Sequence, residues 1–320
     1  MRRIAVLTSG GDAPGMNACI RSVVRYAIYC GMSVYGVDRG FNGLVKENLQ
    51  LMERRSVSDI IQRGGTILKT ARCMEFLTEE GQREAEKVIR EHDIQGVVVI
   101  GGDGSFRGAK DLAYNCGVPV IGVPGTIDND LNYTDFTIGF DTAVNTVLNA
   151  INNLRDTMTS HDRVSIIEVM GRNCGDIAMY AGLAGGCEYM LVPEVEPDYE
   201  AIANKLNQSN RKGKTSDIIL VAEGVGTAEM VKQKLEGLSE VSFRTTVLGH
   251  IQRGGMPTMQ DRVLASRLGI KAVDLLKKGI INRAVGVRHG DVIDVSIDEA
   301  LTAEKRFDYS LYNAANVLSL

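Results

Sequence analysis

Residues 97–105 read Val-Val-Val-Ile-Gly-Gly-Asp-Gly-Ser, a short apolar run that ends at a glycine turn. Similar runs before glycine turns recur at residues 4–7, 164–169 and 218–221, and helical patterns alternate with them. This alternation predicts parallel sheets covered by helices on both faces. We therefore expect an α/β protein with two similar Rossmann-like lobes, mainly parallel sheets flanked by helices, and an active site in the cleft between the lobes.

Apolar residues recur at helical spacing in three segments, which cover residues 20–28, 144–154 and 264–275. Gly31 follows the first segment and Gly279 follows the last, and glycine commonly ends a helix. We expect an amphipathic helix in each segment.

The composition limits the partners and the compartment. The chain has 320 residues and a net charge of −4, so it lacks the overall basic field that attracts nucleic acids or anionic membranes. Its six cysteines are scattered without paired spacing, which is typical of reduced thiols. No stretch approaches the roughly 18 apolar residues of a membrane span. We expect a cytoplasmic protein that binds neither nucleic acid nor membrane.

Asp103 lies on the glycine turn after the apolar run and has two interpretations, a helix N-cap or a Mg²⁺ ligand. A second glycine turn, from Gly10 to Gly15, follows the first predicted strand and could present backbone amides to a phosphate. A dinucleotide fingerprint would need glycine at position 107, where the chain has Arg107, so an NAD-binding dehydrogenase is disfavoured.

Residues 124–130 read Pro-Gly-Thr-Ile-Asp-Asn-Asp and also follow an apolar run. Clustered acids after a proline often form only a turn. On an extended chain, however, Asp128 and Asp130 would face the same way, and their repulsion would need a cation or a proton nearby. We interpret Asp128 as a general base and Asp130 as the residue that orients it, and the two motifs together predict phosphoryl transfer.

Several arginines lie near the ends of predicted strands in this acidic chain, which suggests a phosphate-rich pocket. They are Arg72, Arg163, Arg172, Arg244 and Arg253. His250 is at best a substrate contact. Arg21 and Arg25, four residues apart on the first helix, are by their chemistry alone typical of a solvated face.

Taken together, the motifs resemble those of the bacterial 6-phosphofructokinase family, almost from end to end and in the same order. The resemblance rests on residues 7–17, 101–105, 124–130, 170–172 and 248–255. It implies ATP-dependent phosphorylation of the 1-hydroxyl of fructose 6-phosphate to fructose 1,6-bisphosphate, the committed step of glycolysis, under allosteric control. It also implies Mg²⁺ as cofactor and ATP as co-substrate.

The resemblance assigns roles to individual positions. The catalytic set that it implies is Asp128, Asp130, Thr126, Arg172, Arg72 and the Gly11 amide. The nucleotide site that it implies is Gly11, Phe41, Arg72, Cys73, Gly102, Asp103, Gly104, Ser105 and Gly108, with Asp103 as the metal ligand. The sugar phosphate would contact Thr126, Ile127, Asp128, Arg163, Met170, Gly171, Arg172, Glu223, Arg244, His250 and Arg253.

The resemblance also implies how the chain is divided and assembled. Residues 1–139 with about 252–302 would form the ATP-binding lobe, and residues 140–251 with about 303–320 the fructose 6-phosphate-binding lobe. Arg163 and Arg244 would reach the 6-phosphate from a neighbouring subunit, so the active enzyme is expected to be a homotetramer.

Two glycines indicate the phosphoryl donor. Pyrophosphate-dependent members of the family tend to have aspartate where this chain has Gly104 and lysine where it has Gly125. A side chain at position 104 would crowd the α-phosphate of a nucleotide. With glycine at both positions, the expected donor is ATP.

An effector site for ADP as activator or phosphoenolpyruvate as inhibitor is implied as well. Its residues would be Arg21, Arg25, Arg54, Ser58, Asp59, Arg155, Gly186, Glu188, Lys212 and Lys214. Arg55, Thr215 and Ser216 depart from the family pattern at this site, and Phe41 and Cys73 depart from it at the adenine site.

Two alternatives stay open within the same resemblance. The chain could phosphorylate another ketose phosphate, such as tagatose 6-phosphate. It could also be a non-catalytic regulatory paralogue, which the presence of both Asp103 and Asp128 disfavours.

Overall fold

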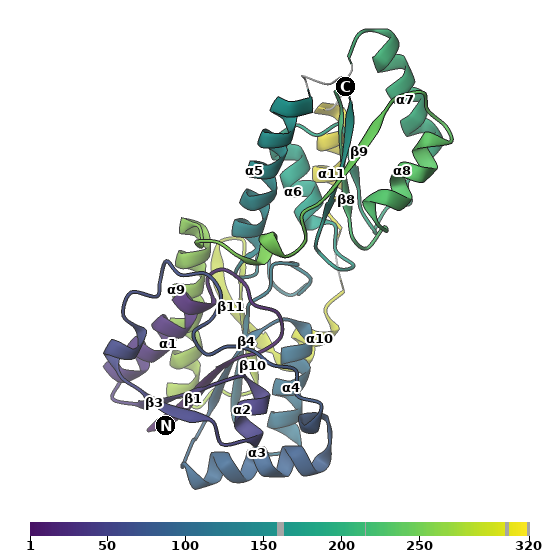
Figure 1. Ribbon diagram of the computed structural model, residues 1–320. Coiled ribbons are helices and arrows are strands. Elements are labelled where there is room, and N and C mark those ends of the chain that lie inside the picture. The colour runs from purple at the N-terminus through teal and green to yellow at the C-terminus, as the bar shows by residue number, and fades with distance from the viewer. Residues whose placement is uncertain (159–162, 215, 305–306, 319–320) are drawn as a thin grey trace. The chain divides into compact units, whose positions relative to one another are not determined.

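The computed structural model (Figure 1) describes residues 1–158, 163–214, 216–304 and 307–318. It contains two compact units. The first comprises residues 1–127, 131–142 and 253–305, and the second comprises residues 128–130, 143–252 and 306–320. The boundary expected from sequence placed residues 128–130 in the first unit. They group with the second because their side chains contact its Arg172 and Asp176.

The first unit is built on a seven-stranded sheet in the order β11-β10-β5-β4-β1-β2-β3. Its strands are β1 (Arg3–Thr8), β2 (Ser33–Val37), β3 (Leu49–Met52), β4 (Val97–Gly101), β5 (Val120–Pro124), β10 (Arg283–Arg288) and β11 (Asp291–Ser296). Only the edge strands β3 and β11 pair antiparallel with their neighbours. The five inner strands are parallel, so their carboxyl ends and the glycine turns that follow them lie along one edge.

Helices cover both faces of this sheet (Figure 1). They are α1 (Met16–Tyr29), α2 (Phe41–Val45), α3 (Glu79–Glu91), α4 (Asp103–Tyr114), α9 (Met259–Lys277) and α10 (Ile297–Thr302), with short 3-10 turns η1 (Arg54–Val57) and η2 (Glu75–Leu77). Alternate residues of β1 and β4, among them Leu7 and Val99, pack with apolar residues of α2, α3 and α4. On the other face α1 packs against α9, where Tyr26 donates a hydrogen bond of 2.8 Å to Asp274.

The second unit has a four-stranded, fully parallel sheet in the order β7-β8-β6-β9. Its strands are β6 (Val164–Val169), β7 (Tyr189–Leu191), β8 (Ile218–Ala222) and β9 (Phe243–Val247). The helices around it are α5 (Phe140–Met158), α6 (Asp176–Gly185), α7 (Tyr199–Arg211), α8 (Ala228–Glu236) and α11 (Tyr309–Leu318), and η3 (Gly249–Arg253) follows β9. α7 and α8 share a buried apolar cluster with one sheet face, and α5, α6 and α11 lie on the other (Figure 1).

The first turn of α5 is tied to α9 by a buried carboxylate. Asp261, which is 1% exposed, accepts hydrogen bonds of 2.8 Å from the amides of Gly139 and Thr142. These bonds satisfy amides that have no partner within the helix, as an N-cap would. The expected α/β class and the three expected helices are confirmed.

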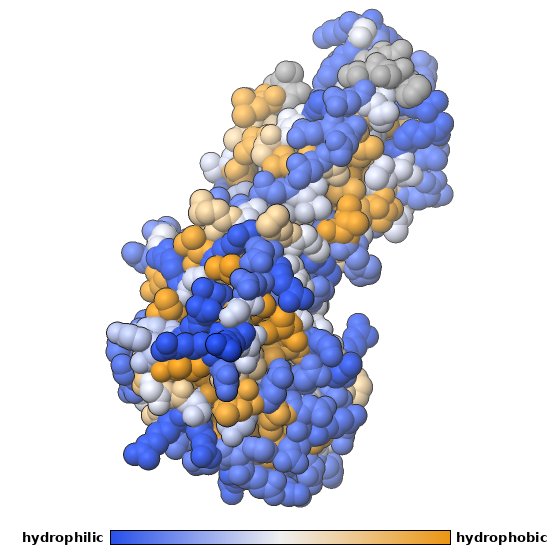
Figure 2. Space-filling model, turned by 60° about the vertical axis from the view of Figure 1, so that its left-hand side comes forward, coloured by the Kyte–Doolittle hydropathy of each residue, from blue (hydrophilic) through white to orange (hydrophobic). Residues whose placement is uncertain are grey.

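Apolar side chains also reach the surface of both units (Figure 2). Along α9, Met259, Val263 and Ile270 are at least 40% exposed and, at spacings of four and seven residues, lie on one face of the helix. In the second unit, Val247 and Ile251 are exposed near the carboxyl end of β9. Among the described helices, none is both long enough and apolar enough to cross a membrane.

Candidate active site

In the first unit, the turn between β4 and α4 carries the first acidic motif. Gly102 occupies the N-cap position and Asp103 is the first helical residue, so of the two interpretations of Asp103 the N-cap is excluded and the Mg²⁺ ligand stays a prediction. The Asp103 carboxylate instead accepts bonds of 3.0 and 3.2 Å from Arg107, and this contact raises the pKa of the Arg107 guanidinium. The free amides at the start of α4 and its helix dipole favour an anion at this turn.

Ser105 adds a polar group to the same turn. Its side chain is 3% exposed, and its hydroxyl has no hydrogen-bond partner among the described residues. A Cβ atom at Gly10 would lie 3.2 Å from this hydroxyl, and one at Gly101 would overlap it. A buried hydroxyl without a partner is costly, so this one is suited to an oxygen atom of a bound ligand.

Gly104 and Gly125, the two glycines that indicate the phosphoryl donor, differ in their surroundings. A Cβ at Gly104 would meet no described atom within 4 Å, and the backbone there is helical, so neither packing nor conformation requires glycine. A Cβ at Gly125 would lie 3.0 Å from Ile100 and 3.2 Å from Met16. Packing therefore accounts for Gly125, whereas the open space at Gly104 is consistent with room for a ligand.

Gly11 and Arg253 lie together in the first unit. The Arg253 guanidinium occupies the space that a side chain at position 11 would fill, and it donates a bond of 3.3 Å to the Asp12 carbonyl. Two positions that are 242 residues apart in the chain and were assigned to different ligands are therefore neighbours. Arg72 is exposed, on a loop before η2.

Phe41 contributes to the core rather than to an open surface. It is 6% exposed, stacks on Phe76 at 4.5 Å between ring centroids, and lies against Gly108, where a Cβ would come within 2.7 Å of the ring. Cys73 packs at the margin of the same apolar cluster. The assignment of Phe41, Cys73 and Gly108 to the nucleotide site stays a prediction.

Thr126 and Ile127 end the part of this loop that belongs to the first unit. The hydroxyl of Thr137 donates a bond of 2.6 Å to the Thr126 carbonyl, and a Cβ at Gly102 would lie 3.4 Å from Thr126. Ile127 is fully buried and lies near Gly139, so a substrate would meet its backbone rather than its side chain.

In the second unit, the two predicted catalytic acids share one arginine. The Arg172 guanidinium lies 3.3 Å from the carboxylate of Asp128 and 3.5 Å from that of Asp130. The Asp128 side chain is 2% exposed and that of Asp130 is 20% exposed. The predicted extended backbone is wrong, because Asn129 has a φ of 53°. The two carboxylates nevertheless face the same cation, as the predicted repulsion requires.

The loop between β6 and α6 holds Arg172 in place. The φ of Arg172 is 53°, a left-handed conformation that is uncommon for arginine and is often found at functional sites. The Arg172 amide donates to Glu223 at 2.8 Å, and the Met170 amide donates to Gln252 at 3.2 Å. The structure thus brings together three residues predicted from the resemblance, Met170, Arg172 and Glu223, with Gly171 between the first two. Gln252 was missed, although it lies within the quoted motif at residues 248–255.

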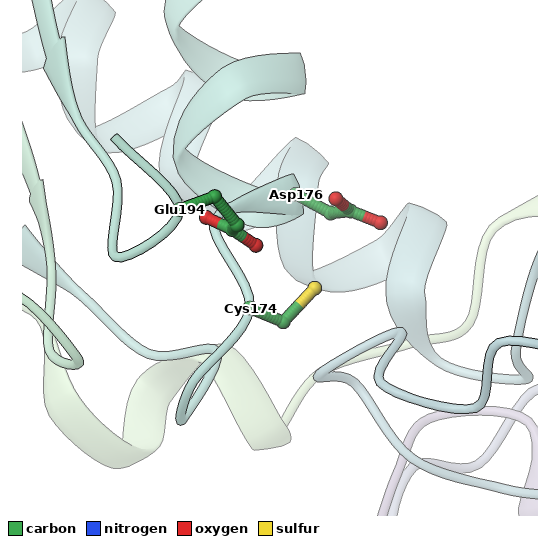
Figure 3. A group of neighbouring side chains, drawn as sticks. All are labelled: Cys174, Asp176 and Glu194. Atoms are coloured by element: carbon green, nitrogen blue, oxygen red, sulfur yellow. The ribbon is translucent and has the colours of Figure 1, made fainter. Parts of the chain in front are cut away.

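Three potential metal ligands lie together in the second unit (Figure 3). Cys174, Asp176 and Glu194 converge from the β6–α6 loop, the start of α6 and the segment after β7, with their ligand atoms within 4.8 Å of one another. All three bond to the protein: Cys174 to the Asn129 carbonyl, Asp176 to the Asn129 amide and Glu194 to the Gly175 amide. We assign them to the support of the acidic segment.

Arg163 and Arg244 lie at the other end of this sheet. Arg163 directly precedes β6, and Arg244 pairs with Ser165 near the start of β9. β6 has six residues, which at about 3.3 Å per residue separates its two ends by roughly 20 Å. Arg172 and His250 follow the carboxyl ends of β6 and β9. Within one subunit these two pairs of residues therefore do not meet.

The second unit also gathers part of the predicted effector site. Arg155 donates to the carbonyls of Gly185 and Gly186 at 2.8 and 2.9 Å. Lys214 contacts Glu188 at 2.8 Å and Asp217 at 2.6 Å beside a cavity of about 190 Å³. Burial alone would lower the pKa of Lys214, but its two carboxylate partners raise it, so the ammonium is retained.

The other predicted effector residues belong to other elements of the chain. Lys212 ends α7, and Thr215 lies outside the described residues. In the first unit Arg21 and Arg25 lie on α1, and the Nε atom of Arg25 is buried without a hydrogen-bond partner among the described residues. The 3-10 turn that carries Arg54 packs beside α1, followed by Ser58 and Asp59.

The geometry can be set beside known proteins. The family model described as Phosphofructokinase matches residues 3–276. The chain is 58% identical over 319 residues to a protein named ATP-dependent 6-phosphofructokinase from Clostridium tetani (strain Massachusetts / E88), and 56% identical over 319 residues to one of the same name from Clostridium botulinum (strain Loch Maree / Type A3). Both matches cover 100% of each chain. A structure of phosphofructokinase from Saccharomyces cerevisiae aligns with a TM-score of 0.89 and 32% identity, covering 100% of this chain and 48% of the yeast chain.

Proposed function

Because this chain belongs to the phosphofructokinase family, we propose that it transfers the γ-phosphoryl group of ATP to the 1-hydroxyl of fructose 6-phosphate, in the cytoplasm. The products are fructose 1,6-bisphosphate and ADP. The observation that carries the proposal is the buried carboxylate of Asp128, which shares the Arg172 guanidinium with Asp130.

Within the proposed reaction, Asp128 removes the proton from the 1-hydroxyl as the oxygen attacks the γ-phosphorus. Asp130 and Thr126 support the position of that carboxylate. Arg172, Arg72 and the Gly11 amide stabilise the negative charge of the phosphoryl group during transfer. Most of the rate enhancement of phosphoryl transfer comes from such positioning and charge stabilisation.

The residues around the β4–α4 turn fit a magnesium-bound nucleotide. The Asp103 carboxylate and the partnerless Ser105 hydroxyl are hard oxygen ligands of the kind that Mg²⁺ prefers, and the start of α4 suits phosphate. We propose that Asp103 holds the ion, for which it would have to release Arg107. Mg²⁺ would reduce the negative charge of the polyphosphate.

The direct test is a steady-state assay of fructose 6-phosphate with Mg-ATP and, in parallel, with Mg-pyrophosphate. Turnover with ATP alone is expected. Turnover with pyrophosphate would overturn the donor assignment and leave the role of Asp128 standing. Turnover of tagatose 6-phosphate in place of fructose 6-phosphate would overturn the assigned sugar, and no turnover with any of them would favour a regulatory paralogue.

Replacing Gly104 by aspartate should weaken ATP binding specifically. The new carboxylate would enter open space at the proposed phosphate site and repel the nucleotide. We expect the KM for ATP to rise by about 10- to 100-fold, which corresponds to about 1.4–2.8 kcal/mol of lost binding. Gly237→Asp is the matched control, because the space beside Gly237 also accepts a side chain and lies at the end of α8. Equal effects of the two variants would contradict the donor argument.

We also propose that the active form is a homotetramer. Arg163 directly precedes β6 and Arg244 lies near the start of β9, at the end of the sheet opposite Arg172, which supports their reaching the sugar phosphate in another subunit. The exposed apolar face of α9 offers surface for such an assembly. A fully active monomer in sedimentation at assay concentrations would exclude this arrangement.

We propose in addition that ADP or phosphoenolpyruvate binds at the predicted effector residues. The buried, partnerless Nε atom of Arg25 supports this, because a guanidinium in such a position is suited to a phosphate. Arg155 and Lys214 are ordered by their own contacts in the second unit.

Arg25→Ala should therefore reduce the response to an effector. Phosphoenolpyruvate shifts the concentration of fructose 6-phosphate that gives half-saturation, and we expect that shift to need about 10- to 100-fold more phosphoenolpyruvate in the variant. A charge-assisted hydrogen bond contributes about 1.5–3 kcal/mol, and each 1.4 kcal/mol is about tenfold in affinity. Arg83→Ala is the control, since Arg83 is an exposed arginine on α3 that pairs only with Glu79 among the contacts described. An unchanged effector response in Arg25→Ala would remove Arg25 from the site.

A further inference from the structure

We propose that Asp176 is a positioning residue for the reaction, and that it fixes the direction of both catalytic carboxylates by holding Asn129 between them. This inference rests on the proposed function, because it concerns how Asp128 and Asp130 are aimed at the same reaction. Asp176 itself is the first residue of α6, directly after the loop that carries Arg172, and acts through Asn129 rather than on the substrate.

The conformation of Asn129 explains why the segment needs to be held. Its φ of 53° is left-handed, which costs free energy in every L-residue and is tolerated best by asparagine and aspartate. A change of the Asn129 φ to an extended value would rotate the residues after Asn129 relative to the residues before it. Asp128 and Asp130 would then no longer both face Arg172.

Two contacts hold Asn129, one at its side chain and one at its backbone carbonyl. Its side-chain amide donates a hydrogen bond of 2.9 Å to the Asp176 carboxylate. The thiol of Cys174 lies 3.7 Å from its carbonyl oxygen and donates a weaker bond. Asn129 is 9% exposed, so water competes little for either contact.

Asp176 is in turn fixed to the core of the second unit (Figure 3). It is the first residue of α6, whose next three residues are all buried. The preceding Gly175 donates its amide to Glu194 at 3.0 Å, and a Cβ there would come within 2.5 Å of Val192. The start of the helix therefore packs closely against the segment after β7, which holds the Asp176 carboxylate in place as an acceptor for Asn129.

The same segment also carries Arg172, the cation that the two acids share. Arg172 and Asp176 are four residues apart and flank Cys174, so the cation and the support of the two acids come from one short, anchored segment. The contacts of Cys174, Asp176 and Glu194 with Asn129 and Gly175 thereby account for the close placement of these three side chains.

A double-mutant cycle tests the proposal. Asp176→Ala removes the acceptor, and Asn129→Gly removes the donor while allowing the left-handed backbone. We expect each single variant to lower kcat by about 10- to 100-fold, because small displacements of catalytic groups are costly, with the KM for ATP within about 2-fold of the wild type. The double variant should be no worse than the poorer single variant, because both changes break one contact. Losses of kcat that multiply would overturn the proposal.

Two further variants separate positioning from charge and from helix stability. Asp176→Asn keeps an oxygen acceptor and should stay within about 5-fold of the wild-type kcat. If it is as impaired as Asp176→Ala, the hydrogen bond is not the cause. Asp198→Ala removes an acid that caps α7 through the Ala201 amide, with no contact to Asn129, and should leave kcat unchanged.

Hydrogen exchange separates this inference from the proposed function, because it does not depend on turnover. Amides of the peptide spanning residues 126–132 should exchange faster in Asp176→Ala and at the wild-type rate in Asp198→Ala. A wild-type protein without kinase activity, but with this exchange pattern, would refute the proposed reaction and retain the support of Asn129. Unchanged exchange in an active enzyme would refute the positioning role alone.

Discussion

Replacing Asp128 by asparagine will lower kcat by about two to four orders of magnitude, because general-base catalysis by a positioned side chain typically contributes that much. The amide has nearly the same shape as the carboxylate, so it can fill the same buried space, but it cannot accept the proton of the attacking hydroxyl. The KM for ATP should change little, since Asp128 is not among the residues predicted to bind the nucleotide.

The measurement is steady-state turnover of fructose 6-phosphate at saturating Mg-ATP. Asp291→Asn makes the same chemical change at an exposed position on β11 and should retain wild-type turnover. If Asp128→Asn also retains near-normal turnover, the carboxylate is not the base, and proton removal would have to be reassigned.

Much of the fold was predictable because its signals are local. The apolar run at residues 97–100 and the turn after it follow from β-branched residues and glycines, and the strand β4 spans Val97–Gly101. Gly31 has a φ of 80°, so its conformation alone explains why α1 ends before it. The family match confirms the resemblance, which rested on motifs whose order and spacing are preserved along the chain.

The sequence predicted which residues form the site better than it predicted their conformations and contacts. The sequence could not show that Asn129 is left-handed, because asparagine adopts both conformations and tertiary contacts decide between them. The sequence also left open whether Asp103 caps the helix, since Gly102 and Asp103 are both good N-cap residues, and the structure places Gly102 at that position. Asp176 and Gln252 act through contacts that are 47 and 82 residues apart in the chain, which no local pattern reveals.

Removing the guanidinium at position 172 should be nearly as damaging as removing the base. In Arg172→Ala we expect kcat to fall by about 10²–10³, a typical loss when one group that stabilises transition-state charge is deleted. Two carboxylates that now share this cation would then repel each other at close range, one of them almost completely buried. That repulsion should raise the pKa of Asp128, because a lost positive charge and a nearby negative charge both disfavour the ionised form.

The pH dependence distinguishes this effect from a simple loss of phosphate binding. Because Asp128 must be ionised to accept a proton, a raised pKa means that the acid limb of the kcat profile moves to higher pH in Arg172→Ala. Arg172→Lys keeps the charge without the two-pronged geometry, so its acid limb should move less while kcat remains low. If kcat falls in Arg172→Ala without any movement of the acid limb, Arg172 serves the transferred phosphoryl group and not the ionisation of Asp128, and its contacts with the two acids would be only structural.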